Sequence, residues 1–299
     1  MPLRIVAEWL ATCGGCECSL LDIGEPLLSI LKVASFVHIP VLMDTKYYGQ
    51  TGEVTQLTLP EADVGIVSGA VRNDDNRLVL VELRKKAKVL VACGSCACFG
   101  GIPALANGIS NNELLKEVYS KEDSSEIPSR RLPALEERVY AIDEVVKVDA
   151  YLPGCPPSPA NISDALSTIA GGKLPKLSSK SVCDSCFLAR EKKDITTIRR
   201  GIELPSANEW GGRCILEQGY LCLGPVTRAG CASGSEGPRC VQAGYPCRGC
   251  YGPLEGGDQY ADMLNALATI GVDPATLPDL KGILSQFTGA KNLSRWRSP

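Results

Sequence analysis

The chain has 299 residues, with 31 basic and 34 acidic side chains and a formal net charge of −3 at pH 7. It contains no long basic run, which argues against nucleic-acid binding, and no run of 18 apolar residues, which argues against a membrane span. Its first residues lack the charged and apolar regions of a secretory signal, so we expect a cytoplasmic protein. The unusual feature is 15 cysteines against one histidine.

That ratio restricts the chemistry. One histidine cannot supply a histidine-rich zinc site or a two-histidine iron site. A serine–histidine–aspartate triad would depend entirely on His38, which lies in an apolar segment and which we interpret as a core residue. In a reducing cytosol, many cysteines at short spacings are typical of metal thiolates rather than of disulfides.

The first part of the chain alternates between strand-like and helix-like segments. Strands are predicted over residues 3–9, 36–43, 62–67, 88–92 and 146–152. Helices are predicted over residues 19–32, 73–86, 111–119 and 158–170. Asn73 or Asp74 can cap the second helix, and Ser158 followed by Pro159 can open the last one. Strands that alternate with helices predict an α/β fold with a doubly wound parallel sheet.

The remainder of the chain is less regular. Residues 120–138 are charged and are predicted to form a surface excursion, and residues 171–182 are predicted to link two domains. Residues 211–257 hold 12 glycines and 4 prolines with few apolar residues, so we expect metal–sulfur bonds to take the place of a hydrophobic core there. Helices are predicted again over 258–270 and 280–287.

Cysteines of the first part follow three predicted strands. Residues 13–18 follow the first strand and begin with a CxxC pair, residues 93–101 follow the fourth strand, and residues 154–157 follow the fifth. The carboxyl ends of parallel strands meet at one crevice, so these loops should bring four or more thiols together. A site made of four thiolates fits zinc or a 4Fe–4S cluster.

Eight further cysteines lie between residues 183 and 250. Their order is Cys183, Cys186, Cys214, Cys222, Cys231, Cys240, Cys247 and Cys250. Eight thiols suggest two four-thiolate sites. The spacing alone leaves open which cysteine serves which site, because iron–sulfur sequences often lend a ligand to the neighbouring cluster.

Taken together, these motifs resemble a known family. They are Trp9-Leu10, CGGCE (13–17), GSCACFGGIP (94–103), GCPPSP (154–159), CDSC (183–186), CLGP (222–225) and YPCRGCYGP (245–253). The chain resembles, over nearly its whole length, the small, electron-transferring subunit of nickel–iron hydrogenases. It is most similar to the methyl-viologen-reducing, deazaflavin-non-reducing type of methanogens.

The resemblance implies three cluster sites. A proximal 4Fe–4S cluster would be bound by Cys13, Cys16, Cys96 and Cys155, a medial 4Fe–4S cluster by Cys231, Cys240, Cys247 and Cys250, and a distal 4Fe–4S cluster by Cys183, Cys186, Cys214 and Cys222. Many relatives have histidine in place of Cys183 and proline in place of Cys240, so this chain is predicted to be all-thiolate with three four-iron clusters. Some deazaflavin-reducing relatives use an aspartate at the proximal site, but the four cysteines here make Asp63 unnecessary.

The resemblance also implies an architecture and a role. Residues 1–170 would form a flavodoxin-like domain with the proximal cluster, and residues 171–299 a smaller, irregular domain with the other two clusters and the C-terminal helices. The chain would relay electrons from hydrogen, split at a nickel–iron centre in a large subunit, to a small iron–sulfur partner and a flavin-containing heterodisulfide reductase. It would carry no catalytic residue, and neither nucleic acid nor a membrane would be a partner.

Three alternatives stay open at this point. A deazaflavin-reducing hydrogenase would share the chemistry with another acceptor, a quinone-side subunit of respiratory complex I would lack the second cysteine-rich part, and a zinc-stabilised scaffold would use the same thiols. Cys18, Cys93 and Cys98 are left over, and we interpret them as small buried hydrophobes near a cluster. For Glu17 we weigh an exposed glutamate against a proton or subunit contact, and for Arg248 a surface residue against a cluster contact.

Overall fold

The computed structural model describes residues 2–119, 132–191, 195–200, 211–232 and 237–292. The chain forms two compact units. The first runs from the N-terminal strand to Lys176 and also takes in the short helix α10 (Gly289–Asn292); the second runs from Leu177 to Thr288. No helix in the described part combines the length and the apolar character needed to cross a membrane.

A five-stranded parallel sheet forms the centre of the first unit. Its strands are β1 (Leu3–Trp9), β2 (Ala34–His38), β3 (Ala62–Ser68), β5 (Ala87–Cys93) and β7 (Ala150–Leu152). They lie in the order β2-β1-β3-β5-β7, and every neighbouring pair is parallel. This is the flavodoxin-like strand order, in which the connections change direction between the first and third strands. The predicted α/β fold with a doubly wound sheet is confirmed.

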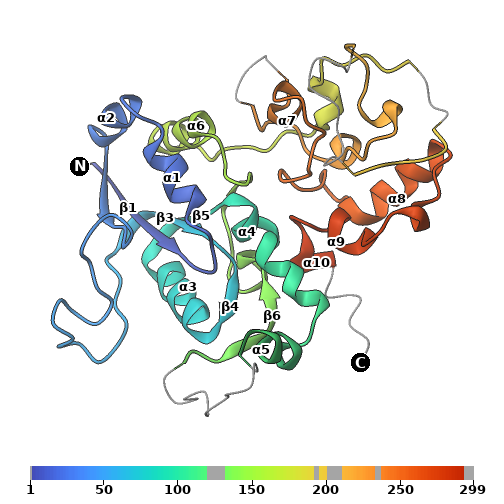
Figure 1. The fold of residues 1–299 in the computed structure, drawn as a ribbon. Coiled ribbons are helices and arrows are strands. Elements are labelled where there is room, and N and C mark those ends of the chain that lie inside the picture. Colours follow the sequence, from blue (N-terminus) through green and yellow to red (C-terminus); the bar gives the residue numbers. More distant parts are fainter. Residues whose placement is uncertain (1, 120–131, 192–194, 201–210, 233–236, 293–299) are drawn as a thin grey trace. The chain divides into compact units, whose positions relative to one another are not determined.

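Helices cover both faces of this sheet (Figure 1). One face is covered by α1 (Gly15–Leu21), α2 (Pro26–Leu31) and α6 (Pro159–Ala170), and the other by α3 (Asp74–Lys86) and α4 (Gly94–Phe99). The strands between them are buried on both sides: Ile5 and Val64 face the first layer, and Val6 and Leu90 the second. The two buried layers fix the strand ends from which the cysteine loops emerge.

Three predicted segments differ from the observed elements. The helix expected over 19–32 is two helices, because Gly24 adopts a left-handed φ of 68° and Pro26 opens a new helix at α2. The strand expected over 36–43 ends at His38, two residues before Pro40. The strand expected over 146–152 shortens to the three residues of β7.

Two strands were not predicted. β4 (Val71–Asn73) and β6 (Leu135–Tyr140) form a small antiparallel sheet, so the end of the predicted surface excursion at 120–138 is a strand. Residues 120–131 of that excursion lie outside the described residues. Near this sheet lie the 3-10 helix η1 (Ile102–Gly108) and the predicted helix α5 (Asn111–Tyr119). Asn73 caps α3, as one of the two predicted candidates, by accepting a hydrogen bond from the Asn76 N–H.

The second unit has little regular structure before its C-terminal helices. Its elements are the 3-10 helices η3 (Val182–Ser185), η6 (Leu216–Gln218), η7 (Gly224–Val226) and η8 (Pro274–Thr276), and the helices α7 (Arg239–Gln242), α8 (Gln259–Thr269) and α9 (Leu280–Leu284). The expected absence of a hydrophobic core is wrong. Leu216, Leu221 and Leu223 are buried in one hydrophobic cluster with Met263 and Leu267 of α8. The few leucines of the glycine-rich segment form a core because they pack on this helix.

Candidate metal centres

The cysteine loops of the first unit begin where three parallel strands end. Cys13 follows β1, Cys16 lies in the first turn of α1, Cys96 lies in α4 after β5, and Cys155 follows β7. The loops are tied together: Ser95 N–H donates to Gly154 O at 2.8 Å, and Ser19 Oγ donates to Pro157 O at 2.5 Å. Loops that are distant in sequence therefore meet at one edge of the sheet, as predicted for parallel strands.

Close approach of backbone to sulfur marks this edge. A Cβ on Gly94 would lie 2.5 Å from the Cys16 sulfur, and Gly94 has a left-handed φ of 85°. Neither the space nor the backbone conformation suits a side chain there. Backbone that lies this close to a thiol sulfur could supply hydrogen bonds to a metal cluster bound by that thiol.

The thiols of this edge raise one another's pKa. Burial, and next the Cys155 thiol, raise the pKa of Cys96 to about 12. A hydrogen bond with the Cys93 thiol, followed by burial and the charges of Cys93, Glu17 and Cys13, raises the pKa of Cys16 far above its usual value. These thiols are thus protonated at neutral pH without a metal, and a bound metal would release their protons.

A second set of thiols gathers in the second unit. Cys183 lies in η3 and Cys186 directly after it, and Cys214 N–H donates to Ala189 O at 2.7 Å, which joins the Cys214 segment to theirs. A Cβ on Gly224 would lie 3.2 Å from the Cys183 sulfur and 3.5 Å from the Cys222 sulfur. The two sulfurs therefore share a space that a side chain would fill.

Electrostatics groups the same four residues. Burial, and then the Cys222 thiol, raise the pKa of Cys183 to about 12, while the Arg190 guanidinium acts in the opposite direction. Burial raises the pKa of Cys222 to about 11, against the hydrogen bonds that its sulfur accepts from backbone N–H groups, and Cys214 and Cys186 add to the rise.

A third set lies around α7. Cys240 is in that helix, Cys231 precedes it, and Cys247 and Cys250 follow it. Burial raises the pKa of Cys240, with Cys231 among the contributing charges. Burial raises the pKa of Cys247, with smaller contributions from Cys222, Cys250 and Cys240. Cys247 N–H also donates to the Cys222 sulfur at 3.3 Å, so the second and third sets adjoin.

The donor chemistry of these sets fits iron–sulfur clusters. Each set offers four thiols, the number that a four-iron cluster takes. In the described part of the chain, no three His, Cys, Asp or Glu side chains are arranged to hold a single metal ion. A four-iron cluster uses one thiolate for each iron, so its ligands surround a larger body than one ion.

The three left-over cysteines differ from one another. Cys93 and Cys98 are buried, as predicted, and the Cys98 thiol donates to Ala92 O at 3.4 Å. Cys18 of α1 is exposed, so the prediction of a buried hydrophobe is wrong for it: its position on the helix faces solvent. Cys93 does more than fill space, because its backbone oxygen accepts from the Cys16 thiol at 3.9 Å; its position at the end of β5, three residues before Cys96, could have indicated this.

Glu17 and Asp63 occupy different ends of the sheet. Glu17 is half-buried rather than exposed, and its Oε1 accepts a hydrogen bond from Ser68 at the end of β3. Asp63 lies at the start of β3, where it accepts hydrogen bonds from Arg4 N–H and Lys88 Nζ. Asp63 is therefore at the amino end of the strands, opposite the thiol loops.

The single histidine is a core residue, as predicted. His38 is 2% exposed, and its Nε2 lies 2.6 Å from Glu8 Oε1. Sequence reasoning missed Glu8, which is 3% exposed although it is ionisable. The signal for it in the sequence was a carboxylate directly after the apolar run Ile5-Val6-Ala7 of β1.

Arg248 is exposed, and its guanidinium donates to Gln286 Oε1 at 2.8 Å. Its backbone N–H also lowers the pKa of Cys240, although burial raises that pKa overall. The side chain is thus a surface residue, while the backbone of the same residue contacts the third thiol set.

Comparisons with known proteins identify the family. Residues 13–169 match the family described as "NADH ubiquinone oxidoreductase, 20 Kd subunit". One subunit of the "F420-non-reducing hydrogenase vhu" of Methanocaldococcus jannaschii is 40% identical over 293 residues, which cover 96% of this chain and 95% of that protein. The chain belongs to the small subunits of nickel–iron hydrogenases. The iron-sulfur subunit of the F420-non-reducing hydrogenase of Archaeoglobus profundus is 33% identical and covers 85% of this chain and 83% of that protein.

Solved structures agree with this assignment. A chain of the "NAD+-reducing [NiFe]-hydrogenase in the H2-reduced state" is 36% identical, with a TM-score of 0.51 over 59% of this chain and 95% of that one. A chain of the [NiFeSe] hydrogenase of Desulfovibrio vulgaris Hildenborough covers 85% of this chain and 94% of that one at 18% identity with a TM-score of 0.54, which supports the fold. As a hydrogenase small subunit, the chain is part of an oxidoreductase and pairs with a large nickel–iron subunit.

Proposed function

We propose that this small subunit relays electrons through three 4Fe–4S clusters. The proximal cluster is assigned to Cys13, Cys16, Cys96 and Cys155, the distal cluster to Cys183, Cys186, Cys214 and Cys222, and the medial cluster to Cys231, Cys240, Cys247 and Cys250. The observation that supports this most is the placement of the thiol segments: the loops after β1, β5 and β7 meet at one edge of the sheet, where Ser95 N–H donates to Gly154 O, and in the second unit the Cys214 segment is joined to that of Cys183 and Cys186.

The clusters would supply one-electron chemistry, and the chain supplies ligands, burial and hydrogen bonds that set their potentials. Backbone N–H groups of Gly224 and Cys247 stabilise the thiolate of Cys222. Cys183 supplies a thiolate to the distal set, where a histidine would raise the cluster potential. Cys240 supplies a thiolate to the medial set, where the lack of a ligand would leave a three-iron cluster. This all-thiolate composition suits a low-potential acceptor.

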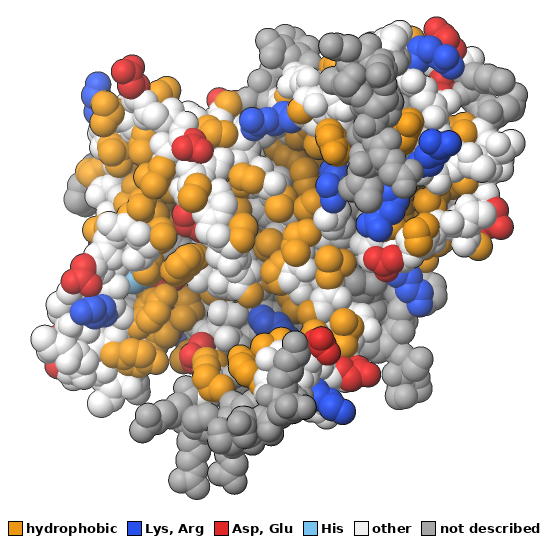
Figure 2. Space-filling model, viewed as in Figure 1, with side chains coloured by type: hydrophobic (Ala, Val, Ile, Leu, Met, Phe, Trp, Pro, Cys, Tyr) orange, Lys and Arg blue, Asp and Glu red, His pale blue; other side chains and the backbone are white. Residues whose placement is uncertain are grey.

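The remaining partners are part of the proposal and are those that the resemblance to methanogen hydrogenases implies. We assign the electron exit to a small iron–sulfur subunit and, beyond it, to a flavin-containing heterodisulfide reductase, as part of methanogenesis in the cytoplasm. Toward the large subunit, Figure 2 shows hydrophobic side chains on the face of the first unit that α1 and α2 form. Leu21, Leu28, Leu31 and Val33 are exposed there, which is typical of a protein–protein interface.

Metal analysis of single-cysteine variants tests the ligand sets. The purified complex should contain about 12 iron atoms in this subunit, and oxidised protein should show no three-iron EPR signal, because Cys240 completes the medial set. Cys16→Ala should lose about 4 of these irons, whereas Cys18→Ala, an exposed neighbour on the same helix, should lose none. Zinc in place of iron would establish the scaffold alternative and end the relay proposal.

The acceptor is tested separately from the clusters. Copurification of the native complex should bring down a heterodisulfide reductase. A deazaflavin-reducing flavoprotein in its place would retain the relay and replace the proposed acceptor.

A further inference from the structure

One ionisable pair is buried in the first unit without a role in the proposed ligand sets. Glu8 of β1 and His38 at the end of β2 are 3% and 2% exposed, and Glu8 Oε1 lies 2.6 Å from His38 Nε2. The other carboxylate oxygen accepts a hydrogen bond from the Tyr47 hydroxyl at 2.9 Å. The Tyr47 ring also lies against the His38 ring, with centroids 5.7 Å apart.

A buried ionisable pair of this kind contributes little to the stability of the fold. Removing two ionisable groups from water costs several kcal/mol for each, and apolar residues of similar volume commonly serve a core equally well. The surroundings here are apolar, since Glu8 follows the core residue Val6 in β1 and His38 precedes the core residue Ile39. Packing alone therefore does not explain why the sole histidine of the chain lies here, and its ability to bind a proton is the property that an apolar residue would lack.

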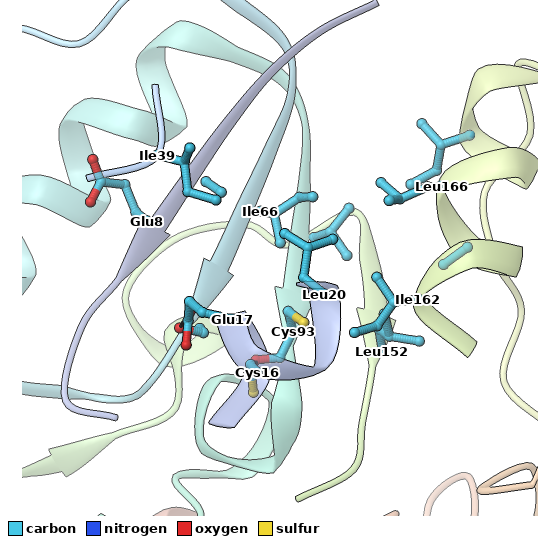
Figure 3. A pocket seen from close by; sticks show the side chains of 15 residues that line it. Glu8, Cys16, Glu17, Leu20, Ile39, Ile66, Cys93, Leu152, Ile162 and Leu166 are labelled. Carbon is cyan, nitrogen blue, oxygen red and sulfur yellow. Dashed lines mark hydrogen bonds between the residues drawn. The ribbon is translucent and has the colours of Figure 1, made fainter. Parts of the chain in front are cut away.

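The pair lies at the thiol end of the sheet. In the sheet register Glu8 is opposite Val67 of β3, and the next residue, Ser68, is opposite Cys93 of β5. Glu8, Cys16 and Cys93 line one cavity of about 30 Å³. Figure 3 shows Cys16 and Cys93 close together, and Glu8 on β1 with its carboxylate directed away from both of them.

Apolar walls separate the pair from the thiols. Much of the remaining lining is aliphatic: Ala7, Leu20, Ile39, Ile66, Val91, Leu152, Ile162, Ala165, Leu166 and Ile169. In such a medium, charges act on one another more strongly than in water. A change of charge at the thiol end therefore changes the free energy of protonating the pair.

The neighbouring titratable groups limit which atom can take up a proton. Burial, and next the Glu8 carboxylate, raise the pKa of Tyr47, so its hydroxyl stays protonated and acts as a donor. Helix α1 presents Glu17 and Cys16 to the cavity, β5 presents Cys93, and the lining residues of α6 are apolar. An imidazole has two ring nitrogens, and with Nε2 facing the Glu8 carboxylate His38 can take up a proton on the other, so His38 is the proton acceptor of the pair.

We propose that the Glu8–His38 pair takes up one proton when the proximal cluster gains an electron. This inference rests on the proximal ligand set proposed above. The electron comes from hydrogen by way of the large subunit, and the proton comes from water. The pair changes from carboxylate with neutral imidazole to carboxylate with imidazolium, so the added negative charge at the thiol end is compensated. When the electron leaves for the acceptor, the proton returns to water.

Potentiometric EPR titration of the purified complex between pH 6 and 9 tests the coupling. In the natural protein the midpoint potential of the proximal cluster should fall as pH rises, by up to 59 mV per pH unit for one proton and one electron. His38→Gln keeps a polar partner for Glu8 but cannot take up the proton, so the slope should disappear. An undiminished slope in His38→Gln, or a flat profile in the natural protein, would overturn the proposal.

Two tyrosines of one loop supply a second variant and its control. Tyr47→Phe removes the donor to Glu8 and should move the sloping region to higher pH, because the carboxylate then holds a proton on the pair more strongly. Tyr48→Phe changes an exposed neighbour and should leave the profile unchanged. If His38→Gln does not assemble, an unshifted Tyr47→Phe profile overturns the proposal. A natural complex without any proximal signal would overturn the ligand set as well, whereas a pH-independent signal overturns this inference alone.

Discussion

The two units hold their thiols by different means. In the first unit a five-stranded sheet, buried on both faces, fixes the strand ends, and the thiol loops extend from these ends. In the second unit η3, η6 and η7 are single turns, and the thiols lie within irregular backbone that packs on α8. The proposed proximal ligands therefore extend from a sheet, whereas the other two proposed ligand sets lie within the irregular backbone itself.

Burial of the proposed ligands shows the same difference. Cys13 and Cys155 are exposed in the first unit, and neither belongs to a hydrophobic cluster. Cys222 and Cys247 of the second unit are buried members of its hydrophobic core. Under the proposed cluster assignment, metal binding and core formation are one process in the second unit, and its folding energy is expected to depend on iron.

Removal of iron should produce the largest contrast between the units. After anaerobic chelation, amides of β1, β3 and β5 should keep their protection from hydrogen exchange, while those of η3, η6 and η7 should lose it. Exchange measured by mass spectrometry on the chelated and the loaded complex reports both units at once. Equal protection of the second unit with and without iron would show that its leucine core suffices, and the contrast between the units would disappear.

Local signals explain what the sequence predicted well. The strands β1, β3 and β5 are apolar runs that parallel central strands require, and each was predicted to within two residues at either end. The N-cap of α6 follows from Ser158 and Pro159, and the side chain of Ser158 does accept from Asn161 N–H. The meeting of the thiol loops followed from topology alone, because it depends on strand direction and not on side-chain detail.

Non-local pairing explains what the sequence did not predict. Strand β6 exists through its pairing with β4, more than sixty residues earlier, and half of its own sequence LEERVY is charged. The contact of Glu8 with His38 depends on the register of β1 against β2, which shifts at an irregularity between Ile5 and Val6. The core of the second unit depends on α8, which lies outside the glycine-rich segment that it covers.

Replacing a core leucine in each unit by alanine tests the same difference between the units, with an expected effect smaller than that of iron removal. Leu83 of α3 and Leu267 of α8 are both fully buried, so replacement by alanine should cost about 2–5 kcal/mol of unfolding free energy in either unit. Leu267→Ala should in addition lower iron content, because the same core contains Cys222 and Cys247, whereas Leu83→Ala should leave iron content unchanged. Urea unfolding with metal analysis measures both, and Leu78→Ala on the exposed side of α3 is the control. Full iron retention in a destabilised Leu267→Ala protein would show that iron binding does not depend on the leucine core of the second unit.

Helix caps give the smallest effect and the most direct comparison of local rules. Asn73 accepts from Asn76 N–H at 2.8 Å to open α3, and Asp258 accepts from the N–H groups of Tyr260 and Ala261 at 3.0 and 3.2 Å to open α8. Replacement of either residue by alanine should cost about 1 kcal/mol, and replacement by serine, which keeps an acceptor, should cost less. Hydrogen exchange within the first turn of each helix measures this. A cap stabilises its helix whatever core lies beneath that helix, so equal losses of stability in the two alanine variants would mean that the units differ in their cores. A negligible loss of stability for Asp258→Ala alone would mean that packing, rather than the cap, holds the first turn of α8.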